Sequence, residues 1–174
     1  MPSSKHAIFI DSQNLYQSTK QDIPEKNYTG FIADNTKLFN FLSNKFQQPD
    51  IYYFVGYLSK YKSMYRALES IGYKLMFKNC IVNKDIVKGN VDVDIAHNIH
   101  LSLFNYDKIS LLSGDGDFLC VVQHLQNQNK FGKLIAPNIH CLSQFLIDSL
   151  KQEDIIYISD PDLRSQLEYI YTKK

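Results

Sequence analysis

Short runs of apolar residues alternate along this chain with segments whose apolar residues recur every three or four positions. The runs are typical of strands buried on both faces, and the longer period is typical of helices with one buried face. The runs predict strands at 7–11, 50–58, 73–79, 108–114, 131–137 and 154–160. The periodic segments predict helices at 34–46, 60–72, 91–104, 117–128 and 142–150, followed by a C-terminal helix over 161–172.

This alternation of strands and helices also predicts the fold class. Strand–helix–strand units place successive strands parallel in one sheet and cover both faces of that sheet with helices. The 174 residues fit one domain of this kind and can bury a sizeable core. We therefore expect an α/β protein, a three-layer α/β/α domain with a mainly parallel, Rossmann-like central sheet.

Three aspartates stand where predicted strands end. Asp11 closes the first apolar run, and Asp115 and Asp117 follow the strand at 108–114 within the segment SGDGD. In parallel α/β sheets, binding sites form outside the carboxyl ends of the strands, where the strand order reverses. If the first strand and the strand at 108–114 are neighbours, three carboxylates meet at one edge of the sheet. That arrangement is costly without a positively charged partner.

A fourth aspartate lies at the start of the helix predicted over 91–104. With Val91 at 0° and about 100° per residue, the apolar stripe spans about 140° and contains Asp92. Asp94 and Asn98 lie together on the flank of that stripe. A carboxylate on the inward face of a helix is rare unless it has a partner. We therefore expect this helix end to point into the same acidic cleft.

Three blocks of this sequence together resemble a known family. They are FIDSQNLY at 9–16, KGNVDVDIAHNI at 88–99 and LLSGDGDFLCVV at 111–122, and in this order they resemble the signature blocks of NYN domains. The resemblance is to the LabA-like group within the PIN-like nuclease fold, and it covers about residues 6–160. It implies one PIN-like domain over 1–174 that binds Mg²⁺ or Mn²⁺ through clustered aspartates and cleaves RNA.

The resemblance also implies roles for individual residues. The expected metal ligands and catalytic residues are Asp11, Asp92, Asp115 and Asp117. The residues expected at the substrate are Asn14, Ser113 and Lys88. Ser113 could equally hydrogen-bond a carboxylate or a phosphate, or cap the turn. Asn14 is expected to orient Asp11 or the backbone, and Lys88 is expected near a bound phosphate.

The sequence departs from the family pattern at three positions. Ser12 replaces a common glycine, Asn90 is an additional residue after Gly89, and Asn98 replaces a frequent aspartate. The last change removes one charge from the rim of the site and weakens the case for two metal ions. Asp94, one helical turn before Asn98, is a candidate to supply that charge.

The expected chemistry is metal-dependent hydrolysis. Carboxylate oxygens suit Mg²⁺ or Mn²⁺, with water and substrate phosphate completing the coordination shell. The cation lowers the pKa of a bound water, orients it toward the scissile phosphate and stabilises the leaving oxygen. No side-chain nucleophile is required, which agrees with the lack of a Ser–His or Cys–His arrangement in the sequence.

Three functions follow from these observations. The first is a metal-dependent ribonuclease, expected to act on single-stranded RNA. The second is an RNA-binding or regulatory module with a weakened or inactive metal site, which Asn98 favours. The third is a phosphatase-like α/β enzyme with an Asp-x-Asp pair. That pair would follow the first strand, whereas here Asp115 and Asp117 come late in the chain.

Charge and cysteine content refine the expected partners and compartment. The net charge is only +1, but the stretch 60–88 holds seven basic residues against two acidic ones, which could follow a polyanion. Cys80, Cys120 and Cys141 are far apart, and we expect buried thiols in a reducing compartment. The sequence shows no signal peptide and no apolar stretch of about 18–20 residues. We expect a cytoplasmic protein without a membrane partner, and a homodimer is compatible with the sequence.

Overall fold

A six-stranded, entirely parallel sheet forms the centre of the protein. The structure, a computed structural model, describes residues 5–79, 81–83, 86–88 and 90–170. The strands lie in the order β3-β2-β1-β6-β7-β8, and every neighbouring pair is parallel. Their bounds are β1 (His6–Asp11), β2 (Asp50–Tyr57), β3 (Lys74–Asn79), β6 (Lys108–Leu112), β7 (Phe131–Ala136) and β8 (Ile155–Tyr157).

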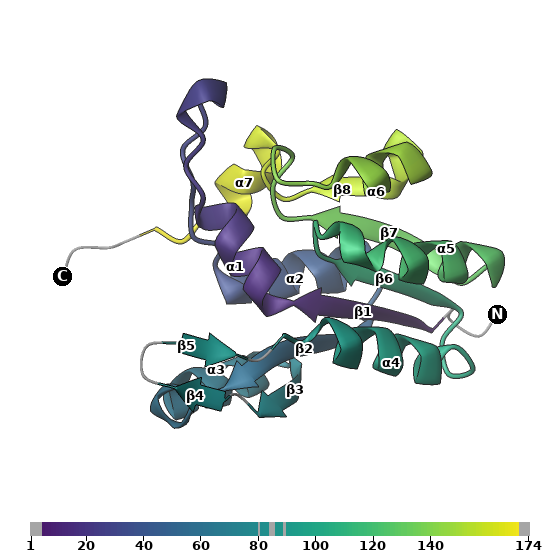
Figure 1. Cartoon of the computed structure of the whole chain (residues 1–174), viewed down its shortest axis with the longest axis horizontal. Helices are drawn as coiled ribbons and strands as arrows, with labels where there is room; N and C mark the ends of the chain where they lie inside the picture. Colours follow the sequence, from purple (N-terminus) through teal and green to yellow (C-terminus); the bar gives the residue numbers. More distant parts are fainter. Residues whose placement is uncertain (1–4, 80, 84–85, 89, 171–174) are drawn as a thin grey trace.

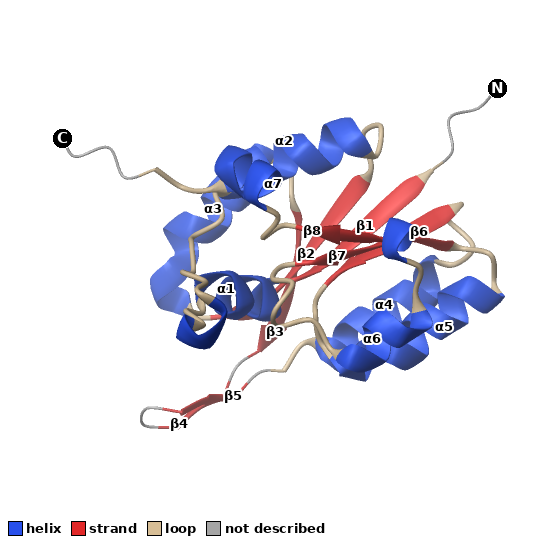
Figure 2. Ribbon diagram, turned by 90° about the horizontal axis from the view of Figure 1, so that it is seen from above, coloured by secondary structure: helices blue, strands red, loops and turns tan. Residues whose placement is uncertain are grey.

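Helices cover both faces of this sheet and complete three layers (Figure 2). One face carries α4 (Asp92–Ser102), α5 (Leu119–Asn127) and α6 (Gln144–Ser149). The other face carries α1 (Ser12–Lys20), α2 (Asn35–Lys45), α3 (Lys62–Ile71) and α7 (Pro161–Leu167). Short 3-10 helices lie at Pro24–Lys26 (η1), Ser59–Tyr61 (η2), Gly116–Phe118 (η3) and Gln152–Asp154 (η4). The predicted three-layer α/β/α fold is confirmed.

The apolar run of β1 is continuous because the strand is buried on both faces. Ala7 and Phe9 belong to the core under α4 and α5, whereas Ile8 and Ile10 belong to the core under α1 and α2. Successive side chains of a strand point to opposite faces, so a central strand between two helical layers needs apolar residues at every position. This arrangement ends at Asp11, the last residue of the strand.

The order of the strands places β1 at the point where the topology reverses. The chain passes from β1 outward through β2 to β3, and then returns to β6 on the other side of β1 (Figure 1). β1 and β6 are paired in register, with Ile10 opposite Leu112. The carboxyl ends of these two strands are therefore neighbours. This is the condition under which the aspartates that follow them can meet at one edge of the sheet.

Three parts of the fold differ from the sequence predictions. Helix α1 was not predicted because it is mostly polar and buries Leu15 as its one large apolar side chain. An antiparallel pair of short strands, β4 (Ile81–Asn83) and β5 (Ile86–Lys88), follows β3 outside the main sheet. The C-terminal helix ends at Leu167 instead of continuing to 172, because Glu168 is extended and forms a bridge with Ala33.

Two further findings concern the thiols and the helices. The prediction of buried thiols is wrong for Cys120, which is exposed, and for Cys141, which is partly exposed. Both lie outside the apolar stripes that face the sheet, and Cys80 lies outside the described residues. In the described ranges the longest helices, α2 and α4, have 11 residues, and no helix is long and apolar enough to cross a membrane.

Candidate metal centre

Three aspartates from two separate segments meet at the reversal point of the sheet. Asp92 begins α4, while Asp115 and Asp117 belong to the loop and 3-10 helix after β6. Each offers one carboxylate oxygen, and these oxygens all lie within 4.8 Å of one another. Asp92 and Asp115 are half-buried and Asp117 is exposed. Three convergent carboxylates form a donor set that suits a hard divalent cation such as Mg²⁺ or Mn²⁺, with open positions for water and phosphate.

The loop after β6 takes its shape from its own aspartates. Asp115 is the N-cap of η3, and its Oδ1 accepts a hydrogen bond from the Asp117 amide at 2.9 Å. Phe118, which follows, is buried in the core and fixes the far side of the turn. Asp115 therefore orders the turn with one oxygen. Its carboxylate also retains acceptor capacity for a cation, because each oxygen has two lone pairs.

Asp11 lies beside this cluster, is buried, and is held by hydrogen bonds from the start of α1 and from Ser113. It is only 3% exposed, and its Oδ1 accepts hydrogen bonds from the amides of Gln13 and Asn14 at 3.1 and 3.0 Å, as the N-cap of α1. Its Oδ2 accepts a hydrogen bond from Ser113 Oγ at 3.3 Å. Asp11 is not among the residues whose oxygens lie within 4.8 Å of one another. Its role as a direct metal ligand stays a prediction.

Ser113 and Asn14 connect the two halves of the site. Ser113 is fully buried, and its Oγ accepts a hydrogen bond from the Asp115 amide at 3.2 Å while donating to Asp11. Asn14 Oδ1 accepts a hydrogen bond from the Gly114 amide at 2.8 Å. The structure thus places both side chains where they fix the SGDGD loop against the start of α1. Of the alternatives for Ser113, the carboxylate contact and the cap of the turn are both present.

Asp92 is positioned by a turn at Asn90, one of the positions where the sequence departs from the family pattern. Asn90, the additional residue of the second block, accepts a hydrogen bond on its Oδ1 from the Asp92 amide at 2.8 Å. This is an Asx turn, the local bond that an asparagine side chain commonly makes to the backbone two residues on, and Asn90 directly precedes Val91, the N-cap of α4. Val91 and Ile95 are buried and fix the first turn of α4 on the sheet. An asparagine two residues before an acidic helix start is the signal that could have identified this role.

The electrostatics of the site favour proton or metal uptake. Burial raises the pKa of Asp11 above its ordinary value, and the Asp92 carboxylate raises it further, against the hydrogen bonds that Asp11 accepts. Burial likewise raises the pKa of Asp92, and the carboxylates of Asp115 and Asp117 add to that increase. The ionised site is therefore destabilised by its own charges, and a divalent cation would relieve this repulsion.

Asp94 and Asn98 interact with partners outside the acidic cluster. The Asp94 carboxylate forms an ion pair with Lys78 Nζ at 2.5 Å, and the Asn98 amide donates to the Asp94 carbonyl at 2.8 Å. Both line a cavity of about 170 Å³ between α4 and β3. Asp94 does not belong to the described acidic cluster, and its role in replacing the charge missing at Asn98 stays a prediction. The side chain of Lys88 lies outside the described residues.

Two lysines of the basic stretch form ion pairs at different ends of β3. Lys74, at the start of β3, pairs with Asp50 at 2.7 Å on the amino edge of the sheet, whereas Lys78 pairs with Asp94 near the carboxyl edge. Lys74 and Lys78 therefore stand at opposite ends of β3, and of these two it is Lys78 that contacts α4.

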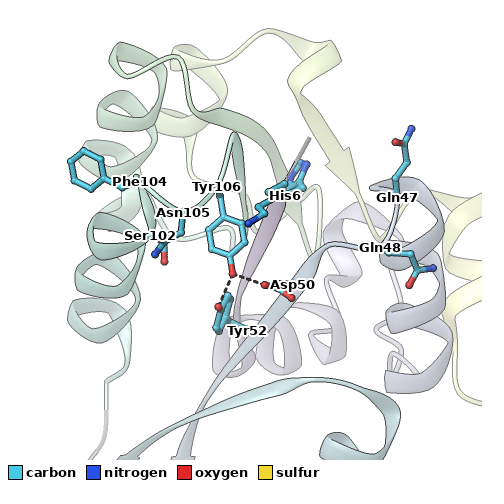
Figure 3. Close-up of a pocket in the computed structure, with 10 residues that line it drawn as sticks. His6, Gln47, Gln48, Asp50, Tyr52, Ser102, Phe104, Asn105 and Tyr106 are labelled. Carbon is cyan, nitrogen blue, oxygen red and sulfur yellow. Dashed lines mark hydrogen bonds between the residues drawn. The ribbon is translucent and has the colours of Figure 1, made fainter. Parts of the chain in front are cut away.

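A second cavity, of about 550 Å³, lies at the opposite, amino edge of the sheet (Figure 3). Its centre is a hydrogen-bonded chain in which Tyr106 OH lies 2.5 Å from an Asp50 oxygen and 2.8 Å from Tyr52 OH. Among the described residues, Asp50 is the one acid that lines this cavity, and it is already paired with Lys74. The residues described there form no convergent acidic set, in contrast to those at the carboxyl edge.

Comparisons with known proteins identify the family. The chain matches the NYN domain over residues 5–150. It is 23% identical over 176 residues to the low amplitude and bright protein LabA of Synechococcus elongatus, covering 95% of this chain and 88% of LabA. A crystal structure of a protein of unknown function from Vibrio parahaemolyticus has a TM-score of 0.75 and 22% identity, covering 96% of this chain and 97% of that one. Because the domain match spans most of the chain, the protein belongs to the NYN domain family, which has the PIN-like nuclease fold.

Proposed function

We propose that the protein is a ribonuclease that hydrolyses RNA phosphodiesters with Mg²⁺ or Mn²⁺ bound at the acidic cluster. The observation that carries the proposal is the convergence of Asp92, Asp115 and Asp117 within 4.8 Å at the carboxyl ends of β1 and β6. Membership of a PIN-like nuclease family supports it. The expected substrate is single-stranded cytoplasmic RNA.

Each residue of the site has a distinct task in this proposal. A divalent cation bound there supplies an activated water and neutralises charge on the phosphate. Asp92, Asp115 and Asp117 would hold that cation, and Asp11 adds negative charge from below, with Oδ2 as its candidate ligand atom. Ser113 and Asn14 keep the loop in register with α1 through their hydrogen bonds to Asp11, Asp115 and Gly114.

A binding module without catalysis is the second candidate. One observation favours it: Asn98 replaces an acid of the family pattern, and its side chain is occupied with the helix backbone. Such a protein would bind RNA, and bind metal weakly, without cleaving the chain. The third hypothesis, a phosphatase-like enzyme, has no comparable support, because the Asp-x-Asp pair of Asp115 and Asp117 follows β6 and not β1.

Cleavage of labelled single-stranded RNA tests the proposal. Wild-type protein should cleave in Mg²⁺ or Mn²⁺ and stop in EDTA, and Asp115→Asn should abolish cleavage. Asp162→Asn is the matched control, because Asp162 is an exposed aspartate on α7, on the other face of the sheet. Equal cleavage by wild type and Asp115→Asn would reveal a contaminating nuclease. Metal-independent RNA binding without cleavage would instead favour the binding module.

A further inference from the structure

The first turn of α6 packs directly on the loop that carries two of the acids. The Ser143 amide donates to the Gly114 carbonyl at 3.0 Å. A Cβ placed on Gly116 would lie 2.5 Å from Ser143 Oγ and 3.7 Å from Cδ2 of Phe145. Gly116 stands between Asp115 and Asp117 in the sequence. The ring of Phe145 therefore lies close to the backbone of the loop that presents Asp115 and Asp117.

Packing of the core does not require this ring. Phe145 is 68% exposed, whereas the next residue, Leu146, is fully buried and fixes α6 against the core. A single exposed apolar side chain is ordinary on a protein surface, so its exposure alone indicates nothing. The position of Phe145 is informative, because this solvent-facing aromatic ring lies near the backbone of the loop that carries Asp115 and Asp117.

We propose that Phe145 is a stacking site for an unpaired nucleobase of the RNA whose phosphate lies at the acidic cluster. Aromatic side chains bind single-stranded RNA by stacking on splayed-out bases, whereas the bases of a duplex are already stacked and paired. The site thus selects single-stranded substrates and holds the chain beside the metal. This inference rests on the proposed ribonuclease function, since it places the scissile phosphate at Asp92, Asp115 and Asp117.

The chain contains no tryptophan, which allows a direct measurement of stacking. Phe145→Trp creates a single fluorophore at the proposed site, and a stacked base should quench it. The experiment adds a short oligoadenylate to this variant in the Asp115→Asn background, which prevents cleavage, while anisotropy of the labelled oligonucleotide records binding. The matched control is Phe104→Trp, because Phe104 is 95% exposed and lines the cavity at the opposite edge (Figure 3). We expect saturable quenching at position 145 and none at position 104.

Kinetics with the wild-type acids give a second measure. Phe145→Ala should raise the KM for single-stranded RNA about tenfold or more with little change in kcat, and Phe145→Tyr should restore it. An RNA that lacks the stacked base should show equal KM values with wild type and Phe145→Ala. Unquenched tryptophan at position 145 with bound oligonucleotide, together with an unchanged KM for Phe145→Ala, would overturn the stacking site.

The same experiments separate this inference from the proposed function. Cleavage by wild type with neither quenching nor a KM effect would leave the ribonuclease and remove the stacking site. Quenching at position 145 without cleavage by wild type in any metal would support the stacking site and remove the ribonuclease.

Discussion

At the scale of single residues, the acids of this site differ in what they already do for the fold. Asp115 caps η3 and Asp11 caps α1, so each has a structural task as well as a predicted catalytic one. Among the described residues, the carboxylate of Asp117 accepts no such helix-capping hydrogen bond. Substitutions that preserve hydrogen bonding but remove charge therefore separate the two tasks.

Asp115→Asn should leave the melting temperature unchanged or raise it. The amide oxygen of asparagine can still accept the hydrogen bond from the Asp117 amide, while repulsion with Asp92 disappears. Asp115→Ala loses the cap as well, and should be less stable than Asp115→Asn by about 1 kcal/mol. Thermal denaturation of the two variants measures this difference. A large loss of stability in Asp115→Asn would mean that the charge itself is structural.

Ser113→Ala should reduce activity and metal affinity about 10- to 100-fold, because Ser113 orients the acids without reaching solvent. Ser113→Cys is a less disruptive comparison that retains a weak donor. Metal titration and cleavage rates measured on the same preparations check this expectation. Wild-type activity in Ser113→Ala would show that the hydrogen bond to Asp11 is dispensable.

At the scale of elements, the site depends on the contact between the SGDGD loop and the turn that starts α6. Gly116 has no side chain where Ser143 Oγ approaches, so Gly116→Ala should force the two segments apart. Overpacking of this kind costs about 1–3 kcal/mol. Gly116→Ala/Ser143→Gly should recover much of that loss, because it removes the atoms that clash. A double-mutant cycle of urea denaturation measures the coupling, and additive losses would contradict the contact.

The elements also show how far the sequence could predict the site. Strand ends identified Asp11 and Asp115, and the helical phase identified Asp92, because burial on both faces of β1 and one face of α4 leaves a regular apolar pattern. No such pattern marks α1, which is mostly polar, or the turn before α6. Contacts such as Asn14 with Gly114, and Ser143 with Gly114, join residues about 100 and 30 positions apart. They depend on strand order, which a local pattern does not contain.

At the scale of the whole molecule, the two edges of the sheet carry opposite pH dependence. Burial, with the nearby Lys108, lowers the pKa of His6 at the amino edge from 6.5 to about 4. The His6 imidazole therefore binds a proton less readily in the folded protein than in the unfolded chain. The stability that neutral His6 contributes is fully present above pH 6.5 and is lost as the pH falls toward 4. At the carboxyl edge the pKa values of Asp11 and Asp92 are raised, so their ionisation costs stability as the pH rises through those values.

His6→Gln should therefore make the protein less sensitive to acid. The variant no longer has the group whose protonation lowers the free energy of unfolding between about pH 6.5 and pH 4. Protonation of Asp11 and Asp92 still stabilises the folded protein at acid pH. Glutamine can keep a hydrogen bond with Ser110, the partner of His6 at 2.9 Å. The measurement is the free energy of unfolding in urea at several pH values. A parallel pH profile in both proteins would exclude His6 as the acid-sensitive group.

Metal binding should couple the stability of the whole molecule to the acidic cluster. An ion that binds only the folded state at 100 times its Kd adds about 2.7 kcal/mol, which for a chain of this size raises the melting temperature by about 5–11 °C. Protons compete for the same oxygens, and the raised pKa values of Asp11 and Asp92 extend this competition to higher pH. Mn²⁺ should therefore stabilise wild type more at about pH 7.5 than at about pH 5. Asp92→Asn should lose most of the stabilisation at both pH values, whereas Asp162→Asn should retain it. Equal stabilisation of Asp92→Asn and wild type would place the bound ion elsewhere on the molecule, and would remove the acidic cluster as the metal site.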